Sequence, residues 1–206
     1  MPLQNRVTPF GDIVAVPQRG FLMGNRGIIH DPATRSLLKR RWTTRAWIIC
    51  VCQFKGVRRE VMARRSWTEL FFFDEATALA AGHRPCFYCQ RQRARAFQAA
   101  WAEGNGTVPL PAPTIDLVLH GERLDAKGGK RRHFIEGSVT DLPDGTMVAE
   151  GDNAYLIKSG KMYLWSWEGY ASSKYPTVNV TLLTPPSTVR ALSAGYAPFM
   201  HPSITP

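Results

Sequence analysis

The sequence has no long apolar run, and no stretch of its 206 residues approaches the roughly 20 apolar residues that a membrane-spanning helix needs. The first residues also lack the charged and then apolar pattern of a secretion signal. We therefore expect a cytoplasmic protein with no membrane partner. In that reducing compartment its four cysteines should be free thiols or metal ligands rather than disulfides.

Familiar catalytic signatures are also missing. The chain contains no phosphate-binding nucleotide loop, no Gly-x-Ser-x-Gly turn and no set of kinase motifs. Its hydrophobic content of 44% is typical of a globular chain rather than a disordered one. The length allows either one large domain or two small ones.

Acidic residues are scarce in the first half of the chain. Residues 1–105 hold 17 Lys and Arg against 7 Asp and Glu, whereas residues 106–206 hold nine of each, so the net charge of +10 belongs to the first half. Most of these cations are arginines, which suit bidentate phosphate contacts, and we expect a nucleic-acid partner. Two alternatives stay open, a solubilising surface and a basic subunit that binds an acidic protein. The predicted phosphate contacts are Arg58, Arg59, Arg64, Arg65, Arg84, Arg91, Arg93 and Arg95.

Composition and periodicity predict an α+β protein with a small strand-and-helix metal-site domain followed by a β-rich domain. The expected segments are a basic N-terminal part at 1–46, the metal-site domain at 47–104, a Gly- and Pro-rich linker at 105–113 and the β-rich domain at 114–206. Strands are expected at 47–54, 57–62, 68–73, 115–120, 146–149, 154–158, 161–167 and 177–183, and helices at 31–38, 74–82, 85–104 and 188–193.

The most informative motif joins two of these helices. Asp74 is a good N-cap for the first helix, and Gly82 suits the left-handed residue that ends it. Pro85 is favourable at the first position of a second helix, which would put Cys86 and Cys89 on one face of its first turn. Because a helix N-terminus favours thiolates, the metal-binding form of cysteine, this arrangement predicts half of a zinc site.

This segment resembles the zinc-binding N-terminal domain of the Ada methyl-phosphotriester DNA repair proteins. The resemblance covers about residues 47–98 and rests on the aromatic run at 71–73, on residues 78–82 and on Arg84-Pro85-Cys86-x-x-Cys89. It implies a zinc site and DNA binding. Arg58 and Met62 stand where the family has its first cysteine pair, one member of which accepts the methyl group. The departure implies that methyl transfer is lost.

Cys50 and Cys52 complete the predicted metal site. Both lie in the expected strand at 47–54, where residues two apart point to the same face. Four thiolates would then make a tetrahedral structural zinc site. His83 is a candidate substitute ligand. The alternative is that Cys50 and Cys52 are small buried hydrophobic residues.

Two enzyme classes that use paired cysteines are not supported by the sequence. A zinc deaminase needs a His-x-Glu or Cys-x-Glu upstream of Pro85, and a thioredoxin-like site needs a βαβ context; the sequence offers neither. A metal-dependent enzyme acting on nucleic acid remains an alternative, with its candidate residues in the second half. These are His120, Glu122, Asp125, His133, Asp141 and Asp144. The preferred prediction is a DNA-binding protein with a structural zinc site, associated with repair or regulation.

Overall fold

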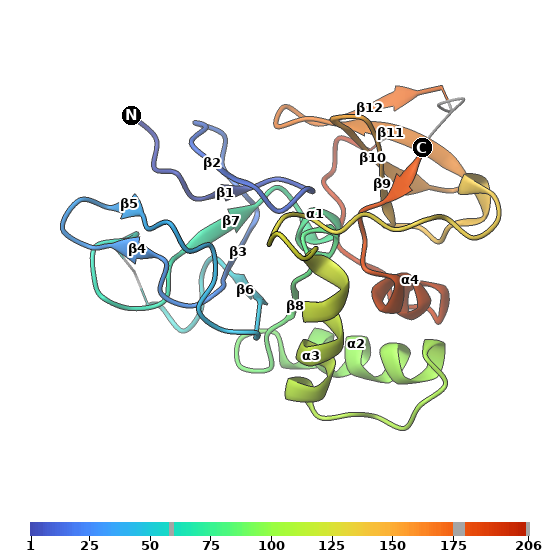
Figure 1. Cartoon of the computed structure of the whole chain (residues 1–206), viewed down its shortest axis with the longest axis horizontal. Helices are drawn as coiled ribbons and strands as arrows, with labels where there is room; N and C mark the ends of the chain where they lie inside the picture. The colour runs from blue at the N-terminus through green and yellow to red at the C-terminus, as the bar shows by residue number, and fades with distance from the viewer. Residues whose placement is uncertain (58–59, 175–179, 205–206) are drawn as a thin grey trace.

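The computed structural model describes residues 1–57, 60–174 and 180–204 and confirms the α+β class (Figure 1). Four α-helices, one short 3-10 helix and three sheets lie in this part of the chain. The helices are α1 (Glu75–Ala80), α2 (Arg91–Gly104), α3 (Ala112–Arg123) and α4 (Pro186–Ser193), and the 3-10 helix is Val139–Asp141.

The first sheet combines the N-terminal segment with the predicted metal-site segment. Its strand order is β2-β1-β7-β3-β6-β8; β1 pairs with β7 and β6 with β8 in parallel, and the other pairs are antiparallel. Residues 1–46 are therefore built into the same sheet as 47–104. The strands are β1 (Arg6–Val7), β2 (Ile13–Val14), β3 (Leu22–Asn25), β6 (Ile48–Val51), β7 (Leu70–Phe72) and β8 (Arg84–Pro85).

The second sheet is antiparallel and has the order β12-β11-β10-β9-β13. Its predicted central hairpin is confirmed, and the turn between β10 and β11 uses Ser159 and Gly160, both with positive φ (49° and 66°). Two left-handed residues are what a two-residue hairpin turn requires. The strands are β9 (Met147–Glu150), β10 (Asn153–Lys158), β11 (Lys161–Trp165), β12 (Tyr170–Ser173) and β13 (Thr181–Leu182).

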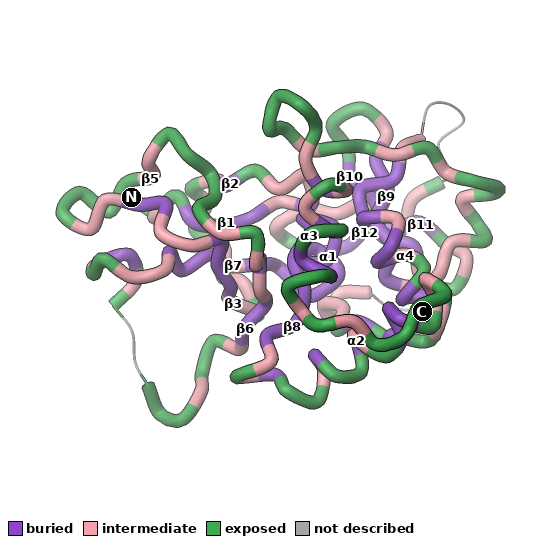
Figure 2. The backbone as a smooth tube through the Cα atoms, turned by 60° about the horizontal axis from the view of Figure 1, so that its bottom comes forward, coloured by how far each residue is buried: buried purple, intermediate pink, exposed green. Residues whose placement is uncertain are grey.

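Helix α1 lies between the two sheets and is buried along its whole length (Figure 2). Its small residues allow this, since Ala78 and Leu79 belong to the core cluster of the first sheet while Ala76 and Ala80 belong to that of the second. The predicted cap is confirmed, because the Asp74 carboxylate accepts a hydrogen bond from the backbone N–H of Thr77 at 2.8 Å.

The other helices join the two halves of the chain. Helix α2 packs on α4 so closely that a Cβ at Gly104 would lie 2.1 Å from the carbonyl oxygen of Arg190, so only glycine fits there. The core cluster of the first sheet takes Phe97 and Trp101 from α2, Ile115 from α3 and Ala191 from α4. Packing therefore crosses the boundaries that composition suggested at 104 and 113.

Four predicted elements differ in the structure. Residues 115–120 belong to helix α3, not to a strand. The segment 31–38 holds no helix, and it lies partly in a small hairpin of β4 (His30–Asp31) and β5 (Ser36–Leu37). No strand forms at Val57 or at residues 60–62, and residues 58–59 lie outside the described chain. The helix expected from Pro85 begins at Arg91. Of the predicted strand 177–183, residues 177–179 are also outside the described chain.

Candidate metal centre

The Cys-x-x-Cys segment lies in a turn between β8 and α2. Arg84 donates its backbone N–H to the carbonyl oxygen of Trp47, just before β6, at 3.1 Å, and Cys86 donates to that of Ile49 in β6 at 2.9 Å. Pro85, which has no N–H group, falls between them where the parallel ladder needs no donor. Strand pairing therefore displaces the predicted helix start, and Cys86 and Cys89 precede α2 rather than form its first turn.

Three of the four predicted ligands converge. Cys50 on β6 meets Cys86 and Cys89, and the three Sγ atoms all lie within 4.8 Å of one another. Thiolates on a tetrahedral zinc ion at about 2.3 Å would lie roughly 3.8 Å apart, so this donor set fits zinc with small adjustments. Cys50 and Cys86 are buried and Cys89 is half-buried. No other group of three or more potential ligands of this kind occurs within the ranges that the structure describes.

The local hydrogen bonds favour a thiolate at Cys86. Its Sγ accepts from the backbone N–H of Tyr88 at 3.4 Å, and the side chain of Gln90 holds the turn against β6 by donating to the carbonyl oxygen of Ile49 at 2.9 Å. Hydrogen bonds from the Cys50 and Cys89 thiols lower the pKa of Cys86 far below its usual value, with the backbone N–H contributing. The same bond and burial raise the pKa of Cys50. Thiolate donors are the form that binds a metal.

Cys52 is not part of the cluster, contrary to the prediction. Strand β6 ends at Val51, so the alternation that would place Cys50 and Cys52 on one face stops before Cys52. The exposed Cys52 thiol donates instead to the carbonyl oxygen of Phe21 at 3.4 Å. The described chain thus supplies three thiol donors, not four.

His83 is a core residue and not a metal ligand. Its ring packs against Trp47 and Phe72, and its Nε2 accepts a hydrogen bond from Arg26 Nε at 3.3 Å. Burial, followed by the charges of Arg26 and Arg123, lowers the pKa of His83 well below its usual value. The imidazole is therefore neutral in the folded protein.

This neutral imidazole predicts a pH dependence of stability. Below about pH 6.5 the unfolded chain binds a proton at His83 that the folded protein does not, so the free energy of unfolding falls as the pH falls. Protonation of His83 in the unfolded chain should lower the free energy of unfolding by about 1 kcal/mol between pH 7 and pH 5.5. His83→Gln keeps an acceptor for Arg26. In denaturant titrations at the two pH values, we expect the drop in the free energy of unfolding to be smaller in this variant by that amount. An unchanged pH slope in the variant would contradict the assignment.

The thiol cluster forms part of the wall of a cavity of about 830 Å³. Cys50, Cys86 and Cys89 line it on one side. Aromatic residues line much of the remainder: Phe54, Trp67, Phe71 and Tyr88. The space is large enough for an aromatic ring system such as a nucleobase.

Lys55 lies beside two aromatic residues of this cavity. Tyr88 is 71% exposed and meets Phe54 edge to face, with ring centroids 5.1 Å apart. Lys55 places its Nζ 5.4 Å from the centroids of both rings. The cavity therefore offers flat apolar surfaces with a positive charge beside them.

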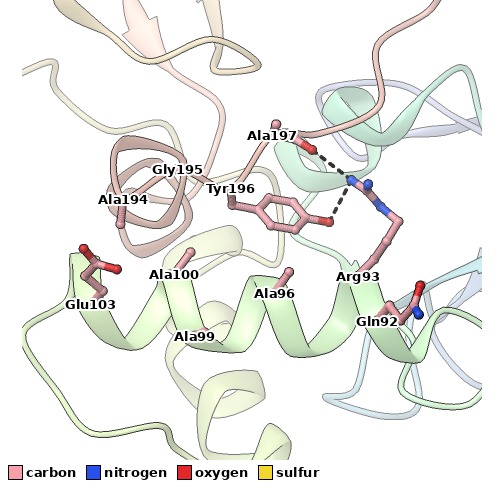
Figure 3. Close-up of a pocket in the computed structure, with 10 residues that line it drawn as sticks. All are labelled: Gln92, Arg93, Ala96, Ala99, Ala100, Glu103, Ala194, Gly195, Tyr196 and Ala197. Atoms are coloured by element: carbon pink, nitrogen blue, oxygen red, sulfur yellow. Dashed lines mark hydrogen bonds between the residues drawn. The ribbon is translucent and has the colours of Figure 1, made fainter.

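Two of the predicted nucleic-acid contacts are held by partners within the protein, one buried and one half-exposed. Arg84 is buried and forms a bidentate ion pair with Asp116, at 2.8 Å from Nε to Oδ1 and 2.7 Å from Nη2 to Oδ2. Arg93 reaches from α2 to the Tyr196 hydroxyl at 3.1 Å and the carbonyl oxygen of Ala197 at 3.0 Å, at one end of a groove of about 460 Å³ (Figure 3). Arg93 also pairs with the buried carboxylate of Glu75.

The other predicted arginines are two exposed pairs and one pair that lies outside the described residues. Arg91 and Arg95 lie one turn apart on the exposed side of α2, opposite the buried Ala94 and Phe97. Arg64 and Arg65 are exposed in the segment that leads to Trp67. Arg58 and Arg59 lie outside the described residues. A phosphate-binding surface would therefore use Arg64, Arg65, Arg91 and Arg95 among the described candidates.

The candidate enzyme residues of the second half do not form one site. Glu122 accepts from Ser187 near the start of α4, His120 accepts from Arg123, and His133 Nε2 contacts the carbonyl oxygen of Glu122. Asp125 and Asp144 accept backbone hydrogen bonds in turns. Asp144 also pairs with Lys158 at 2.7 Å, and Asp141 is the last residue of the 3-10 helix. Each has a local structural partner, and their side chains are not gathered into a common metal-binding group.

Comparisons with models of protein families, with curated proteins and with solved structures gave no match. Nor does any helix among the described residues combine the length and the apolar character needed to cross a membrane. Function must therefore be argued from the site itself.

Sequence reasoning missed the aromatic cavity beside the thiols. One signal was present, because period two along β7 buries Leu70 and Phe72 and turns Phe71 to the opposite face, where it lines the cavity. Tyr88 lies between the two cysteines of the motif, and that position was a second signal that it would lie near the thiols. Trp67 and Phe54 lie outside regular strands, and no periodicity indicates them.

Proposed function

We propose that this protein binds DNA and carries a zinc ion on Cys50, Cys86 and Cys89. The observation that carries the proposal is the aromatic cavity of about 830 Å³ that the three thiols border. Aromatic walls accept unstacked bases, and neighbouring cations hold the backbone, a combination typical of proteins that bind single strands. The resemblance to the Ada zinc domain and the basic first half of the chain support the same proposal.

Each group has a defined part in this proposal. The three thiolates would hold zinc, whose contribution here is to lock β6 to the turn before α2. Tyr88 would stack on a base at the cavity, and Arg91 and Arg95 would contact phosphates from the exposed side of α2. Arg58 and Met62 stand where the related family has cysteines, so no methyl transfer to a thiol is proposed.

Binding of a labelled single-stranded oligonucleotide tests the proposal, with DNA and RNA of the same sequence measured at several salt concentrations. We expect Tyr88→Ala to weaken DNA binding roughly tenfold, because one base loses its stacking partner. Arg91→Ala with Arg95→Ala should lower the log–log salt slope by about 1.4 units on a single strand if each arginine holds one phosphate.

The chain offers matched controls for both changes. Phe134 is 94% exposed and lies away from the cavity lining, and Lys161 is an exposed cation of the second sheet. Phe134→Ala and Lys161→Ala should leave affinity and salt slope unchanged. Absence of DNA binding by the wild-type protein, or equal losses in test and control variants, would refute DNA binding, and a clear preference for RNA would refute the choice of DNA.

A further inference from the structure

A second, smaller cavity lies away from the thiols, between the N-terminal loop, the end of α1 and the segment that follows α3. Its volume is about 100 Å³, enough for a few water molecules or one group of the size of phosphate. Four cationic side chains line it, of which Arg41 is exposed: Arg26, Arg41, Arg123 and Lys130. Exposed residues such as Asp12 and Gly128 also belong to the lining, so the cavity has a side that faces solvent.

Two cations of this cavity are buried, and no described carboxylate forms an ion pair with either. Arg26 and Arg123 are 2% and 1% exposed, and both guanidinium carbons lie 3.9 Å from the ring centroid of Trp47. The two charges are therefore no more than twice that distance apart. Burying like charges together is costly unless an anion accompanies them.

Carboxylates near the cavity are exposed or engaged elsewhere. Asp12 is exposed at the lining, Asp116 pairs with Arg84, and Glu122 accepts from Ser187. Within residues 1–57, 60–174 and 180–204, no ion pair joins a carboxylate to Arg26, Arg123 or Lys130.

The hydrogen bonds of these cations are made to neutral acceptors and leave donors free. Arg26 Nη1 donates to the carbonyl oxygen of Gly11 at 2.9 Å, Arg123 Nη1 donates to that of Gly82 at 3.0 Å, and Lys130 Nζ donates to that of Ala80. Two buried nitrogens have no partner in the described structure, Arg26 Nη2 and Arg123 Nε. A Cβ built on Gly11, itself a lining residue, would lie 3.6 Å from Arg26 Nη2, which places this free donor at the cavity wall.

We propose that this cavity binds a phosphate group, held by Arg26, Arg123 and Lys130. The volume fits a single tetrahedral oxyanion and excludes a whole nucleotide. A phosphate would accept a hydrogen bond from the free Arg26 Nη2 and add a negative charge beside the cations. Free phosphate and the terminal phosphate of a nucleic-acid strand present the same group to the cavity. The proposal does not depend on DNA binding or on zinc.

The electrostatics of the cavity agree with this assignment. Burial, followed by the charges of Arg26 and Arg123, lowers the pKa of Lys130 to about 7. Burial likewise lowers the pKa of Arg26 and of Arg123 to about 9. The local environment therefore disfavours cations, and a bound anion would reverse that effect.

Calorimetric titration of the full chain with inorganic phosphate, in a phosphate-free buffer of constant ionic strength, tests the site. We expect saturable binding and a rise in Tm that sodium chloride at equal ionic strength does not produce. Lys130→Met and Arg26→Gln should each weaken phosphate binding about tenfold or more, because each removes a charged hydrogen-bond donor. Lys127→Met removes an exposed cation of the same segment outside the lining and is the matched control.

Two oligonucleotides that differ only in a 5′-phosphate or a 5′-hydroxyl identify the source of the group. The site is assigned to strand ends if the phosphorylated strand binds more tightly, if Lys130→Met removes that difference, and if free phosphate competes with the strand. Saturable binding of free phosphate with equal binding of the two strands assigns it to the free ion. The proposal is overturned if neither form of phosphate binds, or if folded Lys130→Met and Arg26→Gln both bind phosphate as the wild type does.

Discussion

If the thiol cluster holds zinc as proposed, replacing Cys86 by serine should remove the ion and lower Tm by roughly 10 °C. Cys86 is one of the three thiols of the cluster, so its loss leaves only two thiolate donors. Metal that binds the folded chain alone adds its binding free energy to stability, about 4 kcal/mol at a thousandfold excess over Kd. For a chain of this length that corresponds to roughly 10 °C. Zinc content by elemental analysis and thermal unfolding measure the two effects.

Cys52→Ser provides the matched control for this experiment. Cys52 is two residues from Cys50 but lies outside the cluster and bonds to Phe21. We expect this variant to keep one zinc ion per chain and the wild-type Tm. A wild-type protein that contains no zinc and melts at the same temperature in a chelator would contradict the metal site, and zinc loss in Cys52→Ser would show that the ligand set is wrong.

Replacing Asp116 by alanine should destabilise the protein by about 3–5 kcal/mol, because Arg84 would be left buried and unpaired. The pair is almost completely enclosed, with side-chain exposures of 7% for Arg84 and 5% for Asp116. It connects α3 to β8, which leads directly into the thiol turn. Denaturant titration of wild type and variant measures the loss.

Two comparisons separate the buried charge from a general effect of removing an acid. Glu60→Ala breaks an exposed ion pair with Arg35 and should cost less than about 1 kcal/mol. Arg84→Met combined with Asp116→Leu removes both charges and should recover much of the stability that Asp116→Ala loses, since no buried charge remains. A loss from Asp116→Ala no larger than that from Glu60→Ala would contradict the importance of this pair.

The same ion pair shows where sequence reasoning about the arginines failed. Arg84 belongs to the basic first half and was predicted to contact phosphate, but it is buried against a residue 32 positions away. Residues 115–120 were expected to form a strand, whereas they form part of α3, which carries Asp116 to β8. Charge statistics along a sequence count cations and do not reveal which are neutralised inside the fold.

Local sequence determined those elements whose signals are carried by neighbouring residues. Asp74 caps α1, Gly82 ends it with φ of 83°, and Ser159-Gly160 closes the β10–β11 hairpin. Each depends on contacts within a few residues, so residue type alone specifies the backbone conformation. The convergence of Cys50 with Cys86 and Cys89 was also predicted from the sequence, through strand and motif spacing.

Only the tertiary structure decided which thiols meet and which cations are free. Cys52 leaves the cluster because β6 ends one residue earlier, and the turn at Cys86 is set by pairing of β8 with β6 across more than thirty residues of chain. The cavity of Arg26, Arg123 and Lys130 is assembled from segments that are far apart in the sequence, and no local pattern marks it. Strand ends, burial and long-range pairing are set by the packing free energy of the whole fold, which residue spacing does not report.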